Sequence, residues 1–187
     1  MDTDMLRGRL VKITAQDPKE EAEAVAHWNT DSEWWRLLAS EPTNLFSAKK
    51  ISDWIQKDQE KEPIPGYFFS ICTLEDDRFI GFVGLDGDIY AHGEAFVGIG
   101  IGEREYWSKG YGTDAMQVIL RYGFRELNLR RVALTTFEYN PRAVRSYEKA
   151  GFIHEGRARE FLWREGRRWD LIFMGILREE WFALNTA

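Results

Sequence analysis

The sequence predicts one domain of the α/β (α+β) class, with a mixed and mostly antiparallel sheet flanked by helices and spanning residues 5–181. Three observations support this prediction. The chain has 187 residues, 44% of them hydrophobic, which is enough to bury a core without metals or disulfides. Segments with strand character precede and follow two segments with helical periodicity. Several consecutive strand segments are separated only by short turns, which favours antiparallel pairing.

The first third of the chain is predicted to hold one strand and two helices. Alternating side chains indicate a strand over residues 6–14. Asp17 and Pro18 are typical of a helix start, and Ser47 is the expected cap of a second helix. A short proline-rich stretch at residues 61–66 is expected to be a loop and not a domain boundary. The apolar stripes of the two helices are Ala22, Val25 and Ala26, and Ile51, Trp54 and Ile55.

The rest of the chain alternates between strands and two helices. Three strands form a predicted meander, and a hairpin with a turn at Glu165 and Gly166 closes the chain. Between them lie a helix that follows a glycine-rich loop, with Met116, Val118, Ile119, Tyr122 and Leu127 on one face, then a strand, then a helix with explicit ends. The expected strands are residues 67–74, 78–85, 94–101, 131–137, 154–164 and 169–177.

Composition and charge limit the classes of function. The net charge of −6 argues against a nucleic-acid-binding protein, which needs a basic face. No apolar run is long enough for a membrane span and no secretory leader opens the chain, so we expect a cytoplasmic protein with no membrane contact. The single cysteine, Cys72, lies in an apolar run and is expected to be a packed thiol. His27, His92 and His154 have no metal-ligand spacing, so no metal is expected.

The stretch at residues 106–115 is predicted to leave a strand, turn on glycines and begin a helix. Free N–H groups and the positive end of the helix dipole meet at such a start, and Gly110 and Gly112 have no Cβ to obstruct a phosphate. A plain glycine turn is the alternative. The letters also fit a variant of the Rossmann dinucleotide motif, with Glu138 near the position of its ribose-binding acid. Against that reading, a charged stretch separates the strand from the glycines and too little chain follows.

A second motif lies one helix and one strand further along. Residues 140–152 form a predicted short helix with Asn140 as its cap, Pro141 in its first turn and Gly151 as its end. With this motif the chain resembles the GNAT superfamily of N-acetyltransferases, whose coenzyme loop reads Gln/Arg-x-x-Gly-x-Gly/Ala and whose later motif reads Asn-x-x-Ala-x-x-x-Tyr-x-Lys-x-Gly-Phe. The later motif is complete at Asn140, Ala143, Tyr147, Lys149, Gly151 and Phe152.

One position departs from the family pattern. Trp107 stands where the family has Gln or Arg. The Tyr-Trp-x-Lys-Gly-Tyr-Gly version is similar to the branch that includes ribosomal-protein N-terminal acetyltransferases and polyamine acetyltransferases. The resemblance implies that the strands ending near Ile101 and Phe137 splay apart and that acetyl-CoA lies between them. It also implies a homodimer, which no residue pattern establishes. The implied coenzyme-binding residues are Ile101, Gly102, Lys109, Gly110, Tyr111, Gly112, Thr113 and Asn140.

The resemblance implies direct attack of an amine on the thioester in a ternary complex. Tyr147 would protonate the leaving thiolate, because a phenol keeps its proton at neutral pH. Glu94 is the expected general base, with Asp86, Glu103 and Glu138 as alternatives. A non-catalytic acyl-CoA-binding sensor or interaction module remains the alternative function.

The amine acceptor is expected to be a small cation or a peptide N-terminus. Residues 104–149 hold nine Lys and Arg against five Asp and Glu, while residues 1–77 are acidic. One segment therefore suits an anionic coenzyme and the other a cationic acceptor. The early helices usually line the acceptor side in this superfamily, which nominates Trp34 and Trp35. Polyamine, protein N-terminus, amino acid and aminoglycoside all stay open.

Overall fold

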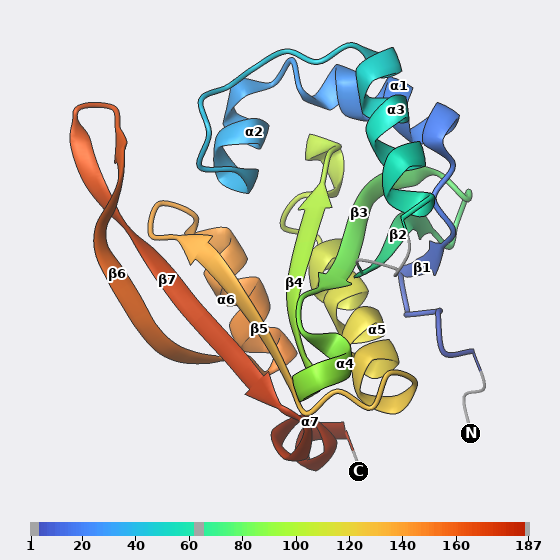
Figure 1. Cartoon of the computed structure of the whole chain (residues 1–187), viewed down its shortest axis with the longest axis vertical. Coiled ribbons are helices and arrows are strands. Elements are labelled where there is room, and N and C mark those ends of the chain that lie inside the picture. Colours follow the sequence, from blue (N-terminus) through green and yellow to red (C-terminus); the bar gives the residue numbers. More distant parts are fainter. Residues whose placement is uncertain (1–3, 62–65, 186–187) are drawn as a thin grey trace.

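The computed structural model describes residues 4–61 and 66–185 of the chain. Their strands form one sheet in the order β1-β2-β3-β4-β5-β7-β6 (Figure 1). Neighbouring strands are antiparallel except for β4 and β5, which run parallel. The sheet confirms the predicted mixed and mostly antiparallel architecture. The strands are β1 (Val11–Thr14), β2 (Gly66–Thr73), β3 (Phe79–Asp86), β4 (Glu94–Ile101), β5 (Arg131–Phe137), β6 (Ile153–Arg164) and β7 (Arg167–Leu177).

Helices flank this sheet. Helices α5 and α6 lie together behind it in the view of Figure 1, and α2 lies near the free ends of β4 and β5. No helix in the described ranges is long and apolar enough to span a membrane. The helices are α1 (Pro18–Trp28), α2 (Ser32–Leu38), α3 (Ala48–Gln59), α4 (Ile89–His92), α5 (Tyr111–Arg125), α6 (Pro141–Ala150) and α7 (Arg178–Asn185), with a 3₁₀ turn, η1, at Arg104–Tyr106.

The main core lies between α5 and the sheet. The helix buries Met116, Ile119 and Phe124 completely, and the first two belong to the face that the sequence periodicity predicts. Burying each such side chain stabilises the fold by about 1.5–3 kcal/mol. This packing holds the first turn of α5 in a fixed position beside β4. The strand residues in the same core are Val83, Leu85, Ala95, Val97, Val132 and Leu134.

The parallel pair β4 and β5 splays apart. Only three residue pairs join the two strands, and the last of them is Phe96 with Ala133. Beyond that pair β4 continues to Ile101 on the β3 side and β5 continues to Phe137 on the β7 side. Figure 1 shows the two strands close together at one end and divergent at the other. The divergence leaves strand edges without a neighbouring strand, and the candidate site lies there.

Side-chain caps fix the helix starts where the sequence predicts them. Asp17, Ser47 and Asn140 each accept hydrogen bonds from backbone N–H groups in the first turns of α1, α3 and α6. Gly151 ends α6 with a φ of +102°, a conformation that favours glycine. The capped helix after β5 is therefore positioned by its own sequence, and it carries Tyr147 to the splayed region.

The structure differs from the expected elements at several places. Helices α2, α4 and α7 were not predicted, because each is short and periodicity is weak evidence over so few residues. The expected strand over 6–14 begins only at Val11, because the preceding backbone turns at Gly8 and donates to the carboxylate of Asp114. Residues 62–65 of the expected loop at 61–66 lie outside the described residues, and Gly66 begins β2.

Candidate active site

A cavity of about 340 Å³ lies at the open end of the splayed strands. It is bounded by the end of β4, the glycine-rich loop, the first turn of α5 and one face of α6, and α2 closes one side. The cavity brings together the two sequence motifs, which lie about one helix and one strand apart in the chain. Its walls include Trp34, Leu37, Leu38, Ile99, Gly100, Ile101, Tyr106, Trp107, Ser108, Gly110, Gly112, Thr113, Asn140, Arg142, Ala143, Arg145, Ser146, Tyr147 and Lys149.

The first turn of α5 presents backbone amides to this cavity. Gly110 precedes the helix with a φ of +96°, and no side chain caps the helix start. A Cβ added at Gly112 would approach only the Cγ1 atom of Ile101, at 3.7 Å, so the surface there is open. The N–H groups at the start of this 15-residue helix therefore remain available to an anion, and the helix dipole favours one.

Helix α6 adds positive charge to the opposite wall. Arg142, Arg145 and Lys149 are spaced by three and four residues, which places them on one side of the helix, and all three line the cavity. Burial lowers the pKa of Arg142, and the charge of Arg104 adds to this effect. The sequence prediction did not nominate these three residues, although their helical spacing after the Asn140 cap was a usable signal. Together with the α5 amides they make a site for a polyanion.

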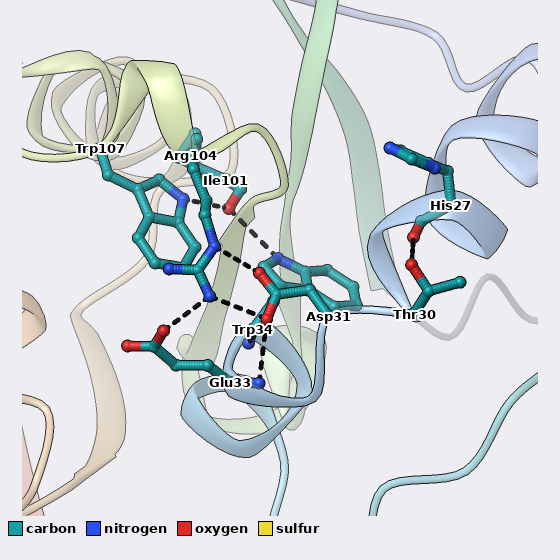
Figure 2. Close-up of polar contacts among 8 residues, drawn as sticks. All are labelled: His27, Thr30, Asp31, Glu33, Trp34, Ile101, Arg104 and Trp107. Carbon is teal, nitrogen blue, oxygen red and sulfur yellow. Dashed lines mark hydrogen bonds and ion pairs between the residues drawn. The ribbon is translucent and has the colours of Figure 1, made fainter.

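The end of β4 presents peptide groups toward the splay. Gly102 donates its N–H to the carbonyl of Ile80 on β3, at 2.9 Å. Because the hydrogen-bonding direction alternates along a strand, the peptide groups of Ile99 and Ile101 point the other way, toward the missing neighbour. The Ile101 carbonyl accepts the indole N–H groups of Trp34, at 3.2 Å, and Trp107, at 2.9 Å (Figure 2). Gly102 itself does not line the cavity.

Trp107 and Arg104 connect α2 to the glycine-rich loop. The Arg104 guanidinium binds both oxygens of Asp31, at 2.6 and 2.8 Å, and Glu33 at 2.6 Å (Figure 2). The Trp107 ring lies between Arg104 and Arg142, whose guanidinium carbons are 4.8 and 3.7 Å from the ring centroid. Trp107 at the family's Gln/Arg position thus anchors the Ile101 carbonyl. Asp31 and Glu33 are therefore already paired with the Arg104 cation.

A second cavity, of about 370 Å³, lies on the sheet face beneath α2. It shares Leu37, Leu38, Ile99 and Tyr147 with the first cavity, so the two spaces adjoin at Tyr147. Burial raises the pKa of Tyr147 to about 12. The protonated phenol of Tyr147 therefore lies where the two cavities meet. The other residues of the second cavity are Phe68, Phe82, Gly84, Asp86, Phe96, Val97, Gly98, Thr135, Thr136, Phe137 and Leu171.

Glu94 is not at either cavity, which corrects the expectation of a general base there. It begins β4, at the end opposite Ile101, and forms ion pairs with Arg131 and, at 3.9 Å, Arg130. Its cross-strand position opposite Arg131 explains this pairing. Glu94 is thus on the strand that reaches the first cavity but at the end away from it.

The alternative acids fall in three different places. Glu103 accepts the indole N–H of Trp28 at 3.1 Å. Glu138 accepts the backbone N–H of Asp170 at 3.3 Å. Neither residue lines a cavity, whereas Asp86 lines the second one. Partial loss of hydration raises the pKa of Asp86, although its side chain still reaches solvent.

The remaining predicted site residues divide into two groups. Ile101, Gly110, Gly112, Thr113 and Asn140 line the first cavity, and the Thr113 hydroxyl lies 2.8 Å from that of Ser146. Lys109, Tyr111 and Gly102 lie outside it. Trp34 is buried at 3% exposure and lines the first cavity but not the second, and Trp35 packs on Phe46, outside both cavities. In the ranges 4–61 and 66–185, no three His, Cys, Asp or Glu residues are grouped to hold a metal.

Comparisons with known proteins agree with this geometry. The family model of the acetyltransferase (GNAT) domain matches residues 8–153. In Bacillus subtilis, the protein named "SPbeta prophage-derived uncharacterized N-acetyltransferase YokL" is 29% identical over 139 residues, which cover 74% of this chain and 75% of the relative. "Putative ribosomal N-acetyltransferase YdaF" from the same organism is 28% identical over 149 residues, which cover 79% of this chain and 78% of the relative.

A solved structure extends the similarity over nearly the whole chain. The spermidine N-acetyltransferase from Vibrio cholerae, in complex with CoA and spermine, superposes with a TM-score of 0.80 and 25% identity. The superposition covers 92% of this chain and 98% of that one. The fold and the family match together define an acyl-transfer protein, and the chain belongs to the GNAT family of acetyltransferases. It is an acetyl-CoA-dependent N-acetyltransferase, as the names of its relatives indicate.

Proposed function

We propose that the chain transfers the acetyl group of acetyl-CoA to a primary amine by direct attack, with both substrates bound at once. The observation that carries this proposal is the meeting of two cavities at Tyr147. One cavity has the amides and cations that suit an anionic coenzyme, and the other opens on the sheet face. Holding both reactants in such adjoining sites supplies proximity, which is a large part of the catalysis available without a covalent intermediate.

The coenzyme would occupy the first cavity. In this proposal the N–H groups from Gly110 to Thr113 bind the diphosphate, and the α6 cations Arg142, Arg145 and Lys149 balance the remaining phosphate charge. The amide groups of the pantetheine arm lie along Ile99 and Ile101, where they replace the missing strand. Asn140 would lie beside the arm, with its side-chain oxygen already used to cap α6.

Tyr147 would act as the general acid. The reaction forms a C–N bond and breaks the C–S bond, and the leaving thiolate needs a proton. With its pKa raised to about 12, Tyr147 carries that proton at neutral pH. Glu94 takes no part in this mechanism, because it is paired with Arg131 away from both cavities. The amine proton would leave through water in the second cavity.

The acceptor class follows from the relatives only in outline. One similar structure holds spermine, and one relative is named as a ribosomal N-acetyltransferase. We therefore propose a polyamine, a protein N-terminus or another small cationic amine as the acceptor. A screen of these amines for release of CoA thiol identifies the substrate directly.

Thermal unfolding tests the coenzyme site. At about 100 times its dissociation constant, acetyl-CoA should stabilise the protein by about 2.7 kcal/mol, which raises Tm by roughly 5–10 °C for a chain of this size. Gly112→Glu should abolish the shift, because it places a carboxylate among the amides. Gly156→Glu is the matched control, since a Cβ there meets nothing within 4 Å and the residue lies outside both cavities. An unchanged Tm of the wild-type protein in millimolar acetyl-CoA would contradict the proposal.

The alternative that the sequence left open, a non-catalytic acyl-CoA sensor, is at odds with the N-acetyltransferase names of the relatives. Tyr147→Phe separates the two functions. An enzyme should lose about 100-fold in kcat while its dissociation constant for acetyl-CoA stays the same. A sensor would release no CoA thiol with any amine, in either the wild-type protein or the variant.

A further inference from the structure

The second cavity is apolar and aromatic on most of its surface. Four phenylalanines line it, and two of them are solvent-exposed: Phe68 at 38% and Phe96 at 47%. Its floor is the cross-strand pair of Gly84 and Gly98. A Cβ at Gly98 would meet nothing within 4 Å, so the space above this glycine is empty. The leucines of α2 form the roof. Such a surface favours an apolar occupant.

The same cavity contains a single carboxylate. Asp86 is the only Asp or Glu among the described residues that line either cavity, and it forms no ion pair with any side chain of residues 4–61 and 66–185. Asp31 and Glu33 on the neighbouring α2 segment are bound to Arg104 and are not available. The adjoining coenzyme cavity contributes cations only. One positive charge on an acceptor can therefore be balanced here, and further charges cannot.

We infer that the acceptor is a primary amine carried on an apolar or aromatic body, with the body lying over Gly98 and Phe96. This inference rests on the proposed acetyl transfer and narrows its substrate. A polyamine would bring additional ammonium groups into a space with a single carboxylate and next to three cations, and stripping such groups of water is costly.

The register of the sheet gives the direction in which the acceptor lies. Ile99 is on the wall shared with the coenzyme cavity, and Phe96, three residues earlier on β4, is opposite Asp86. Three residues of a strand span about 10 Å. The reacting amine thus lies at Tyr147, and its body extends along β4 toward Asp86. An arylalkylamine and a peptide whose first residue is aromatic both provide this chemistry.

Steady-state kinetics with defined amines test the inference. The probes are 2-phenylethylamine, the amidated dipeptide Phe-Leu, ethylamine and spermidine, each with saturating acetyl-CoA and thiol detection. We expect kcat/KM for at least one aromatic probe to exceed that for spermidine by tenfold or more. Phenylethylamine and the dipeptide distinguish a small-molecule source from a peptide source. Preference for spermidine would overturn the inference but leave acetyl transfer intact, and release of thiol with none of the amines would contradict the proposed function itself.

Two variants test the second cavity without changing a residue that lines the first. Gly98→Leu should fill the floor and lower kcat/KM for phenylethylamine at least tenfold more than for ethylamine, with the acetyl-CoA dissociation constant within twofold. Gly156→Leu, at an equally open glycine outside both cavities, should change neither. Asp86→Asn should lower kcat/KM for the aromatic amine about tenfold, as expected for unit charges about 10 Å apart at reduced dielectric. Equal losses with ethylamine and phenylethylamine in Gly98→Leu would overturn the inference.

Discussion

At the scale of single residues, Tyr147 gives the clearest pH dependence. Its pKa is raised to about 12 by burial, so its proton is present at every pH below that value. An aliphatic amine has a pKa of about 10.4 and becomes a nucleophile as pH rises. We therefore expect kcat to rise from about pH 6 to about pH 10 with no descending limb from the tyrosine. Initial rates across this range check the expectation.

The control for this profile is Tyr147→Phe, whose residual rate should rise with pH in the same way. A descending limb of the wild-type profile below about pH 9 that is absent from the variant would contradict the expectation. It would show that the phenol loses its proton within the working range and that its surroundings do not hold the pKa high.

Gly102 packs closely against Trp28 beside the site. A Cβ at Gly102 would lie 1.8 Å from the Cδ2 atom of Trp28, whose ring is 3% exposed. Gly102→Ala should therefore lower the free energy of unfolding by about 1–3 kcal/mol, the usual cost of overpacking. Urea unfolding measures this change in the free energy of unfolding. Gly98→Ala is the control, because an added Cβ at this β4 residue meets nothing within 4 Å. It should change the free energy of unfolding by less than about 0.5 kcal/mol. Equal effects of the two substitutions would show that Trp28 moves aside.

At the scale of elements, α2 is held from both ends. This helix has seven residues and is too short to persist by itself. Asp31 caps its start and is bound in turn by Arg104. At its other end, Arg164 of β6 donates to the carbonyl of Arg36 in the helix, at 2.8 Å, and to that of Ser40 just after it, at 3.3 Å. Arg164 also contacts the Tyr139 hydroxyl, so the hairpin and α2 form one clamp across the splay.

Arg164→Lys tests this clamp. A single ammonium group cannot reproduce the fork of donors that arginine offers to several carbonyls. We expect the KM for the amine to rise about tenfold, since α2 roofs the second cavity, and the acetyl-CoA dissociation constant to stay within about twofold, since the first turn of α5 is untouched. Binding by calorimetry and steady-state kinetics check both. Arg167→Lys, on the same hairpin but stacked on Trp169, is the control. An equal loss of both affinities would contradict a local role for Arg164.

At the scale of the whole molecule, the sequence was a good guide to elements whose signals are local. The α6 cap, the Gly151 end and the apolar face of α5 were predicted because propensity, capping and periodicity act within a few residues. Helix α2 was missed because its stability comes from Arg104 and Arg164, which lie far away in the chain. Tertiary contacts of this kind have no counterpart in a local pattern.

The candidate site could be predicted only in part for the same reason. Backbone-driven features, such as Gly110 and Gly112 at the start of α5, follow from residue type. Asp86 is opposite Phe96 and therefore lies at the same end of the sheet as Glu94, yet Asp86 lines the second cavity while Glu94 is paired with Arg131 outside it. Local sequence does not reveal such tertiary pairing. The second cavity is lined by residues of strands β2, β3, β4, β5 and β7, and its shape is therefore a property of the assembled sheet.

The double anchoring of α2 has a consequence for how such a protein can diversify. Arg104 binds the side chains of Asp31 and Glu33, Arg164 binds backbone carbonyls near the end of α2, and neither contact uses the side chain of Leu37 or Leu38. Substitutions at these two positions would therefore leave both attachments of α2 in place. Because Leu37 and Leu38 line both cavities, such substitutions would reshape the walls of both at once.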